Sequence, residues 1–394
     1  MKADCKKRLI LNTTLVSAGT VREQSGLFIN EDGRIADVFS MADFDKAKYG
    51  ECDTLDACGH LVTPGLIDTH IHGIGGFGPD DCTMQSALGM SERLAQFGVT
   101  GFFPTLYAGS ADKMERETKE AVKAIGKEGG ARILGINLEG PFLNPKKCGA
   151  QDPKALIQPD AATFNRLIQA GEGHVKAMTI APELPGLEEI TPLAEKQGVV
   201  LLMGHTDATY DQAVRAMDLG IRHATHTFNA MSRMDHKNPG VAGCALFHDA
   251  MHCELIADGV HVHRDLVAFL IKTKPQDKVV LITDSLKPTA LGPGRYVANG
   301  DPVVLGERGA FVMERDPSVL CGSALTLNAA VRNVACWTGD RAQAVRMATE
   351  NPAAVYGFGE IGALAKGKLA DIAVFDEEFN ATEVFVGGKL IYKK

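Results

Sequence analysis

The segment PGLIDTHIHG, residues 64–73, joins a short apolar run to two histidines that stand two positions apart. Alternate residues of a strand point to the same face, so the side chains of His70 and His72 project together if this segment is a strand. Two imidazoles that face the interior of a barrel converge on one point, where they can bind a metal ion. We therefore expect residues 65–72 to form a barrel strand whose end carries metal ligands.

Apolar runs of the same kind recur along the middle of the chain and alternate with stretches of helical character. Eight runs can be placed, at residues 65–72, 99–105, 132–139, 175–183, 199–205, 221–226, 253–261 and 278–284. The helical patterns lie at residues 91–97, 111–127, 160–170, 190–197, 210–219 and 265–272. This alternation indicates a parallel sheet, and eight such units suit an α/β fold of the (β/α)8 TIM-barrel type. A doubly wound open sheet is the alternative, but the glycine-rich dinucleotide fingerprint is missing after the first strand.

The sequence pattern at both ends of the chain differs from that of the middle. Short strand patterns bounded by Gly, Asp and Asn occur at residues 8–12, 26–30 and 34–38, and again at 371–375, 383–386 and 389–392. The pair Gly387-Gly388 between the last two runs is typical of a hairpin turn. We therefore expect a small discontinuous β-sandwich domain formed by residues 1–61 and 360–394, and a barrel domain over residues 62–359.

Most of the eight runs end in a side chain that can bind a metal or move a proton. In chain order these residues are His70, His72, Glu139, Glu183, His205, His226, His261 and Asp284, while the second run ends in Thr105. A barrel brings the carboxyl ends of its strands together on the face where active sites of this architecture lie. The sequence therefore predicts an active site built from these strand ends.

The residue types at the strand ends suggest hydrolytic metal chemistry. A carboxylate such as Glu139 is costly to bury unless it is paired or binds a metal. With His205 and His226 it forms a set suited to zinc or iron(II), which leaves a position open for water. Asp284 is placed to take a proton from the attacking water and deliver it to a leaving group. His261 is free to polarise a substrate carbonyl.

Composition excludes several other classes of function. The chain has 394 residues with a net charge of −8 and no basic stripe, so nothing favours binding to nucleic acid or to an anionic membrane. No apolar run approaches the roughly 20 residues of a membrane-spanning helix, and the N-terminal region lacks a signal-peptide core. Nine scattered cysteines without a Cys-x2-Cys pair suggest reduced thiols and a cytoplasmic setting.

Several motifs together resemble the N-acetylglucosamine-6-phosphate deacetylase family of the amidohydrolase superfamily, over nearly the whole chain. These are residues 64–73, LEGPF (138–142), CGAQ (148–151), GHTDA (204–208), HTFNAM (226–231), ADGVH (257–261), TDS (283–285) and LCGSALTL (320–327). The resemblance implies a small-molecule substrate, N-acetyl-D-glucosamine 6-phosphate, cleaved to D-glucosamine 6-phosphate and acetate. It also implies a homodimer with each site near the interface.

The resemblance assigns roles to individual residues. Glu139, His205 and His226 would bind the principal divalent metal, zinc or iron, and Asp284 would be the catalytic acid and base. In relatives with His-x-His a second metal is held at the positions of His70 and His72 and bridged by the glutamate, so one or two ions per subunit are expected. Substrate contacts fall to Ala150, Gln151, Asn229, Ala230, His261, Leu320, Cys321 and Gly322.

One position departs from the family pattern. The sugar-phosphate anchor of the family is an arginine shortly before Pro-Gly, whereas this chain has Lys237 ahead of Pro239-Gly240. Lysine keeps the charge but loses the two-pronged geometry of a guanidinium. His236 or Arg233 would compensate, and the alternative is that Lys237 is a solvated loop residue.

Other functions remain open alternatives. Hydantoinase-like and dihydroorotase-like enzymes use a carbamylated lysine at the tip of the fourth strand, but the lysine of this strand, Lys176, is at its other end. Mononuclear deaminases of the same fold lack the Glu-Gly-Pro of residues 139–141. A non-catalytic scaffold would have lost ligands that this chain keeps. A deacetylase of N-acetylgalactosamine 6-phosphate is the nearest alternative.

Overall fold

The computed structural model describes residues 6–394, so the first five residues of the expected small domain lie outside the described part. Eight parallel strands form the barrel predicted from the sequence: β6 (Leu66–Ile71), β7 (Val99–Tyr107), β9 (Ile136–Glu139), β10 (Val175–Ile180), β11 (Val200–Met203), β12 (His223–Ala224), β13 (His252–Ile256) and β14 (Val279–Ile282). The short β8 (Arg132–Ile133) precedes β9 and pairs with β7. The barrel closes where the backbone N–H of Asp284 donates to the carbonyl of His70, at 2.9 Å.

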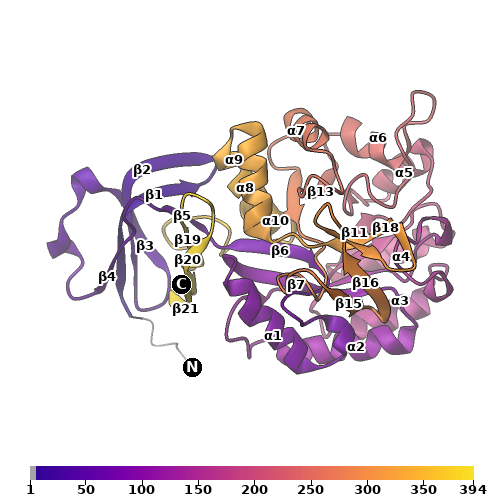
Figure 1. The fold of residues 1–394 in the computed structure, drawn as a ribbon, viewed down its shortest axis with the longest axis horizontal. Helices are drawn as coiled ribbons and strands as arrows, with labels where there is room; N and C mark the ends of the chain where they lie inside the picture. The colour runs from indigo at the N-terminus through magenta and orange to yellow at the C-terminus, as the bar shows by residue number, and fades with distance from the viewer. Residues whose placement is uncertain (1–5) are drawn as a thin grey trace.

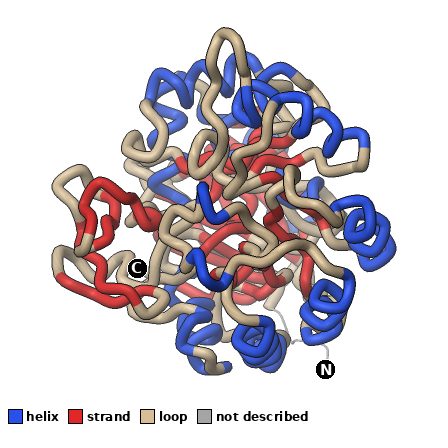
Figure 2. The backbone as a smooth tube through the Cα atoms, turned by 90° about the vertical axis from the view of Figure 1, so that its right-hand side faces the viewer, coloured by secondary structure: helices blue, strands red, loops and turns tan. Residues whose placement is uncertain are grey.

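The barrel strands are almost wholly buried, as parallel strands covered on both faces must be. Helices surround the strands on the outside (Figure 2). They are α1 (Met84–Ala95), α2 (Ala111–Ala124), α3 (Ala161–Ala170), α4 (Leu187–Gln197), α5 (Tyr210–Asp218), α6 (Gly240–Phe247), α7 (Arg264–Thr273), α8 (Leu327–Thr338), α9 (Arg341–Met347) and α10 (Glu350–Val355). In α2, for example, the side chain of Ser110 caps the first turn, and Met114, Thr118 and Ala121 form the buried stripe.

Strands from the two ends of the chain form a separate sheet beside the barrel (Figure 1). They are β1 (Arg8–Ser17), β2 (Thr20–Ile29), β3 (Ile35–Ser40), β4 (Asp53–Asp56), β5 (Leu61–Pro64), β19 (Ile372–Phe375), β20 (Ala381–Val386) and β21 (Lys389–Lys393). β5 pairs with β1 on one side and with β19 on the other, so it joins N-terminal to C-terminal strands. Ile10, Leu27, Val62, Ile372 and Phe385 belong to a hydrophobic core of this part alone. The predicted barrel with a smaller β unit from both termini is confirmed.

The limits of the two domains stay a prediction. The expected boundary between residues 61 and 62 falls inside β5. All of β5 pairs with strands of the terminal sheet, β1 and β19. Helices α8 and α9 lie between the terminal sheet and the barrel (Figure 1).

A third sheet, which was not predicted from the sequence, follows β14 and covers part of the barrel. It is antiparallel and consists of β15 (Arg295–Ala298), β16 (Asp301–Leu305), β17 (Ala310–Met313) and β18 (Asp316–Ser323). Its apolar side chains, among them Phe311 and Met313, pack with Tyr107 and Leu286 of the barrel in a small core. The insertion therefore contacts the carboxyl-end face of the barrel. Within residues 6–394, no helix combines the length and the apolar character needed to cross a membrane.

Candidate active site

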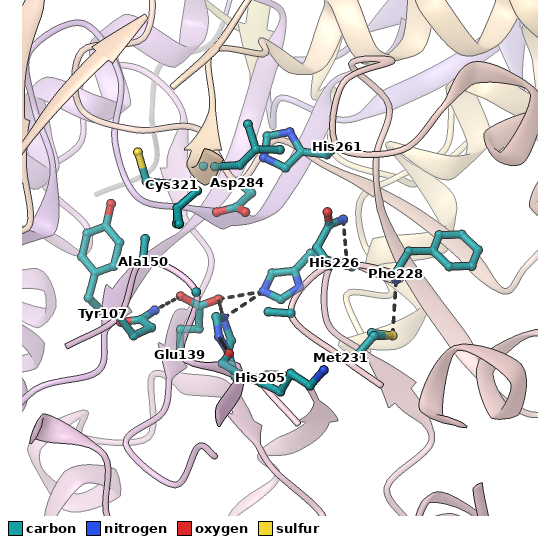
Figure 3. A pocket seen from close by; sticks show the side chains of 18 of the residues that line it. Tyr107, Glu139, Ala150, His205, His226, Phe228, Met231, His261, Asp284 and Cys321 are labelled. Atoms are coloured by element: carbon teal, nitrogen blue, oxygen red, sulfur yellow. Dashed lines mark hydrogen bonds and ion pairs between the residues drawn. The ribbon is translucent and has the colours of Figure 1, made fainter. Parts of the chain in front are cut away.

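Glu139 lies at the centre of a cluster of imidazoles at the carboxyl ends of the barrel strands (Figure 3). Its Oε1 atom is 3.0 Å from Nε2 of His205 and 3.0 Å from Nε2 of His226. Nε2 of His72 is 3.2 Å from Oε2, and Nε2 of His70 is 3.5 Å from Oε1. All five side chains are buried, so the structure brings together the complete ligand set expected from the sequence.

The backbone at the strand ends aims these side chains inward. His205, His226 and Asp284 have positive φ values of 46°, 29° and 50°. A residue other than glycine pays about 1–3 kcal/mol for such a conformation, which persists only where the surroundings enforce it. Each of the three lies two residues beyond the end of a barrel strand. Three residues of the predicted site therefore adopt this conformation, which also occurs at turns elsewhere in the chain.

Hydrogen bonds on the far side of the imidazoles fix their orientation. Nδ1 of His205 contacts the carbonyl of Lys147 at 2.9 Å, and Nδ1 of His72 contacts the carbonyl of Thr105 at 2.9 Å. Nδ1 of His70 contacts the buried carboxylate of Glu254 at 3.2 Å. A ring that donates from Nδ1 keeps Nε2 available as a metal ligand. The three rings are therefore held with Nε2 toward Glu139.

These residues fit one or two divalent metal ions. Two buried groups of three ligands are present, Glu139 with His205 and His226, and His70 with His72 and Asp284, and the ligand atoms of each lie within 4.8 Å of one another. Nε2 of His70 is buried with no hydrogen-bond partner in the described part of the chain, although it faces the cluster. Three ligands with an open position are the usual arrangement of catalytic metal sites. The donor set matches zinc or iron(II).

The carboxylate and the imidazoles of the cluster shift one another's pKa values. Burial alone would raise the pKa of the Glu139 carboxyl, but the charge of His205 and hydrogen bonds from the histidines hold that pKa well below its usual range. Burial alone would lower the pKa of His70, but the nearby carboxylates of Glu139 and Glu254 raise it well above its usual range. Metal binding must displace protons from such imidazoles, so metal affinity is expected to rise with pH.

The two predicted catalytic residues border the same cluster. Oδ1 of Asp284 lies 3.4 Å from Nε2 of His72 and 3.8 Å from Nε2 of His70. Nδ1 of His261 lies 2.6 Å from Oδ2 of Asp258, which orients the ring. Asp284 and His261 both line the central cavity, as Figure 3 shows.

The cavity has a volume of about 480 Å³ and opens over the cluster. It is lined by the substrate contacts expected from the family pattern, namely Ala150, Gln151, Asn229, Ala230, His261, Leu320, Cys321 and Gly322. Lys237 is placed differently, exposed on the loop after Ser232 and outside the cavity wall. Arg233, at the start of that loop, lines the cavity together with Lys146 and Lys147.

The sequence did not single out several residues of the site. Tyr107 lines the cavity and stacks on His72 with ring centroids 3.9 Å apart, because β7 continues two residues beyond Thr105. Glu254 holds His70 from the middle of β13. Its signal was a carboxylate inside an apolar run, which is costly to bury without a partner. Glu183, expected with the other strand ends, lies outside the cavity wall.

Comparison with known proteins agrees with this geometry. Residues 61–391 match the Amidohydrolase family. The chain is 32% identical over 393 residues to N-acetylglucosamine-6-phosphate deacetylase of Bacillus subtilis (strain 168), covering 98% of this chain and 97% of the relative. It is 32% identical over 337 residues to N-acetylgalactosamine-6-phosphate deacetylase of Escherichia coli O157:H7, covering 84% of this chain and 87% of the relative.

A solved structure shows the same fold over the full length. A mutant of N-acetyl-D-glucosamine-6-phosphate deacetylase from Mycobacterium smegmatis, in complex with N-acetyl-D-glucosamine-6-phosphate, superposes with a TM-score of 0.91 at 28% identity, covering 98% of this chain and 100% of that chain. The barrel, the converging ligands and these matches show that the chain belongs to the amidohydrolase family of hydrolases. Within that family it groups with the N-acetylglucosamine-6-phosphate deacetylases, so the resemblance seen in the sequence is confirmed.

Proposed function

We propose that the protein hydrolyses the acetamide of N-acetyl-D-glucosamine 6-phosphate to D-glucosamine 6-phosphate and acetate, with the help of a divalent metal ion. The observation that carries the proposal is the contact of one buried carboxylate, Glu139, with His205 and His226, beside Asp284 in the cavity wall. The activities named for the full-length relatives support the choice of substrate.

Each residue has a defined task in this reaction. A metal ion held by Glu139, His205 and His226, with room for a second at His70 and His72, would polarise the acetamide carbonyl and lower the pKa of the attacking water. Asp284 takes a proton from that water as its oxygen bonds to the carbonyl carbon. Asp284 then gives the proton to the nitrogen as the C–N bond breaks, so the amino sugar leaves as a neutral amine.

His261 stabilises the carbonyl oxygen as negative charge develops on it. Its Nδ1 atom is held by Asp258 at 2.6 Å, so the ring is fixed before substrate arrives. Burial raises the pKa of the Asp258 carboxyl, but the hydrogen bond and the charge of His261, together with hydrogen bonds from two backbone N–H groups, lower that pKa below its usual value. With Nδ1 taken up by Asp258, Nε2 is the ring nitrogen that remains for a hydrogen bond to the developing oxyanion.

Cationic side chains support a phosphorylated substrate. Arg233, Lys146 and Lys147 line the cavity and place positive charge at its wall. Lys237 occupies the position that carries arginine in the family pattern, on the same loop as Arg233. We assign phosphate binding to the loop of residues 232–239, with Lys237 and Arg233 as the two candidate anchors.

We propose N-acetyl-D-glucosamine 6-phosphate as the substrate rather than the galactosamine analogue. A relative named as an N-acetylgalactosamine-6-phosphate deacetylase has the same sequence identity to this chain, 32%, so the two substrates have to be compared directly. The experiment that tests the proposal is a panel of both N-acetylhexosamine 6-phosphates and both plain sugars with the metal-loaded protein. The expected result is the highest kcat/KM on the gluco phosphate. A higher value on the galacto phosphate would move the assignment to the second substrate, and hydrolysis of neither would overturn the function.

Metal, assembly and location belong to the same proposal. We assign zinc or iron as the metal from the ligand types. We assign a homodimer. The side chains of Met234, in loop 232–239, and Phe247, at the end of α6, are exposed and would offer an apolar contact. We place the enzyme in the cytoplasm on the strength of its scattered, unpatterned cysteines.

A further inference from the structure

Glu183 follows the fourth barrel strand and forms a hydrogen-bonded junction between three loops. Its Oε1 atom accepts from Nδ2 of Asn144 at 2.7 Å and from the backbone N–H of Asp207 at 2.6 Å. Its Oε2 atom accepts from the hydroxyl of Thr206 at 2.5 Å. Asn144 belongs to the loop after β9, and residues 206 and 207 follow His205 after β11. One half-buried carboxylate therefore ties the loops of the third, fourth and fifth strands together.

The partners of Glu183 contact His205 from two sides. On one side Thr206 and Asp207 are the residues directly after His205 in the chain. On the other side the backbone N–H of Asn144 donates to the carbonyl of His205 at 2.9 Å. Since His205 has a positive φ of 46°, its conformation depends on such contacts to persist.

Asn144 also controls the group that orients the His205 ring. Its Oδ1 atom accepts from the backbone N–H of Lys146 at 2.9 Å and caps the short turn Pro145–Lys147. The carbonyl at the end of this turn, that of Lys147, is the partner of His205 Nδ1 at 2.9 Å. Mutation of a group that hydrogen-bonds to the non-ligating nitrogen of a metal-binding histidine typically lowers metal affinity by about 10–100-fold. The path from Glu183 to the ligand nitrogen therefore runs through Asn144 and Lys147.

We propose that Glu183 is a positioning residue for the metal ligand His205, acting through the Asn144 turn and through residues 206 and 207. The inference rests on the proposed metal-dependent function. In this account the carboxylate of the fourth strand, which lies outside the cavity, sets the affinity of the principal metal site.

The test is the dissociation constant for Zn²⁺, measured by chelator competition on the full-length protein. Glu183→Ala is expected to weaken binding about 10–100-fold. Glu183→Gln is expected to stay within about threefold of wild type, because its amide oxygen accepts from Asn144 and Asp207 while Thr206 accepts instead of donating. Glu188→Ala, which removes an exposed carboxylate near the start of α4, is the matched control and should leave the constant unchanged.

A second variant tests whether Glu183 acts on His205 through Asn144, and it keeps the inference testable if Glu183→Ala does not fold. Asn144→Ala should weaken Zn²⁺ binding in the same way, and the double variant Glu183→Ala/Asn144→Ala should lose little more than either single variant. The melting temperature of the metal-free protein separates a positioning role from a purely structural one. The inference would be overturned if Glu183→Ala had a lower melting temperature but wild-type Zn²⁺ affinity. It would also be overturned if Glu183→Ala and Glu183→Gln lost Zn²⁺ affinity equally. Absence of Zn²⁺ binding by the wild type would overturn the proposed function with it.

Discussion

The Nε2 atoms of His205 and His226 lie 3.2 Å apart, and each is 3.0 Å from the same oxygen of Glu139. Two nitrogen lone pairs at this separation repel each other unless a cation or a proton lies between them. The carboxylate beside them favours positive charge at that point. This relationship defines the principal metal site. The site lies in the wall of the cavity that Asp284 and His261 also line.

Loss of either histidine is expected to abolish tight metal binding at that site. His205→Ala and His226→Ala each leave two ligands, which is below the three that catalytic sites retain. His70→Ala should instead lower the metal content per subunit while activity remains measurable. Metal analysis of the purified variants checks this. Equal and complete loss in all three would show that two metals are obligatory and that the ligands rank equally.

Asp284→Asn is expected to keep its fold and its bound metal but lose turnover. A general acid and base contributes about 10²–10⁴-fold to the rate, and asparagine can neither take nor deliver the proton. Steady-state kinetics with parallel metal analysis measures the effect. Near-normal turnover with unchanged metal content would exclude Asp284 from proton transfer.

Lys237→Ala and Arg233→Ala distinguish the two candidate phosphate anchors. A charge-assisted hydrogen bond is worth about 1.5–3 kcal/mol, which corresponds to roughly a 10- to 150-fold rise in KM. The variant that removes the anchor should show this rise for the phosphorylated sugar and almost none for the plain sugar. Lys237→Arg should retain or improve binding if Lys237 is the anchor. The same small change on both sugars would show that the altered residue does not bind phosphate.

Acid should destabilise the protein through His252. Its ring stacks on His223 with centroids 4.4 Å apart, and burial, with the charge of Lys278, lowers its pKa from 6.5 to about 4. Between these values the unfolded chain binds a proton that the folded chain does not, so stability present above pH 6.5 is lost as the pH falls. The loss attributable to His252 is at most about 3 kcal/mol.

Urea unfolding of the metal-free protein at pH 7 and pH 4.5 measures this loss. His252→Gln should show a smaller drop in the free energy of unfolding than the wild type between the two values. His236→Gln, at an exposed position, is the control and should behave as the wild type does. An identical drop in wild type and His252→Gln would contradict the prediction.

The barrel and its ligands were predictable because both leave strong local signals. A parallel strand buried on both faces is a continuous apolar run, and the residue that ends it points to one common face. His70, Glu139, His205 and Asp284 follow this rule. The same reasoning misplaced Glu183, because the fourth run continues three residues beyond the observed end of β10, where the chain has already turned away from the cavity.

The remaining elements lack such a signal. Helix α6 is buried along almost its whole length, so its sequence GVAGCALF shows no polar face by which an amphipathic helix is recognised. The strands β15–β18 are mostly short and partly exposed, so they lack a continuous apolar run, and their buried side chains pack against Tyr107, which is distant in sequence. That Arg233 lines the cavity and Lys237 does not depends on the path of one loop, which periodicity does not describe.

Acetate release from N-acetyl-D-glucosamine 6-phosphate during metal titration tests the central claim most directly. The protein is stripped of metal with a chelator and then titrated with Zn²⁺ or Fe²⁺ while acetate is measured. The account predicts no release before metal is added, and a rate that rises with metal and saturates at one or two ions per subunit. Undiminished release from the stripped protein, or no release with either metal, would contradict it.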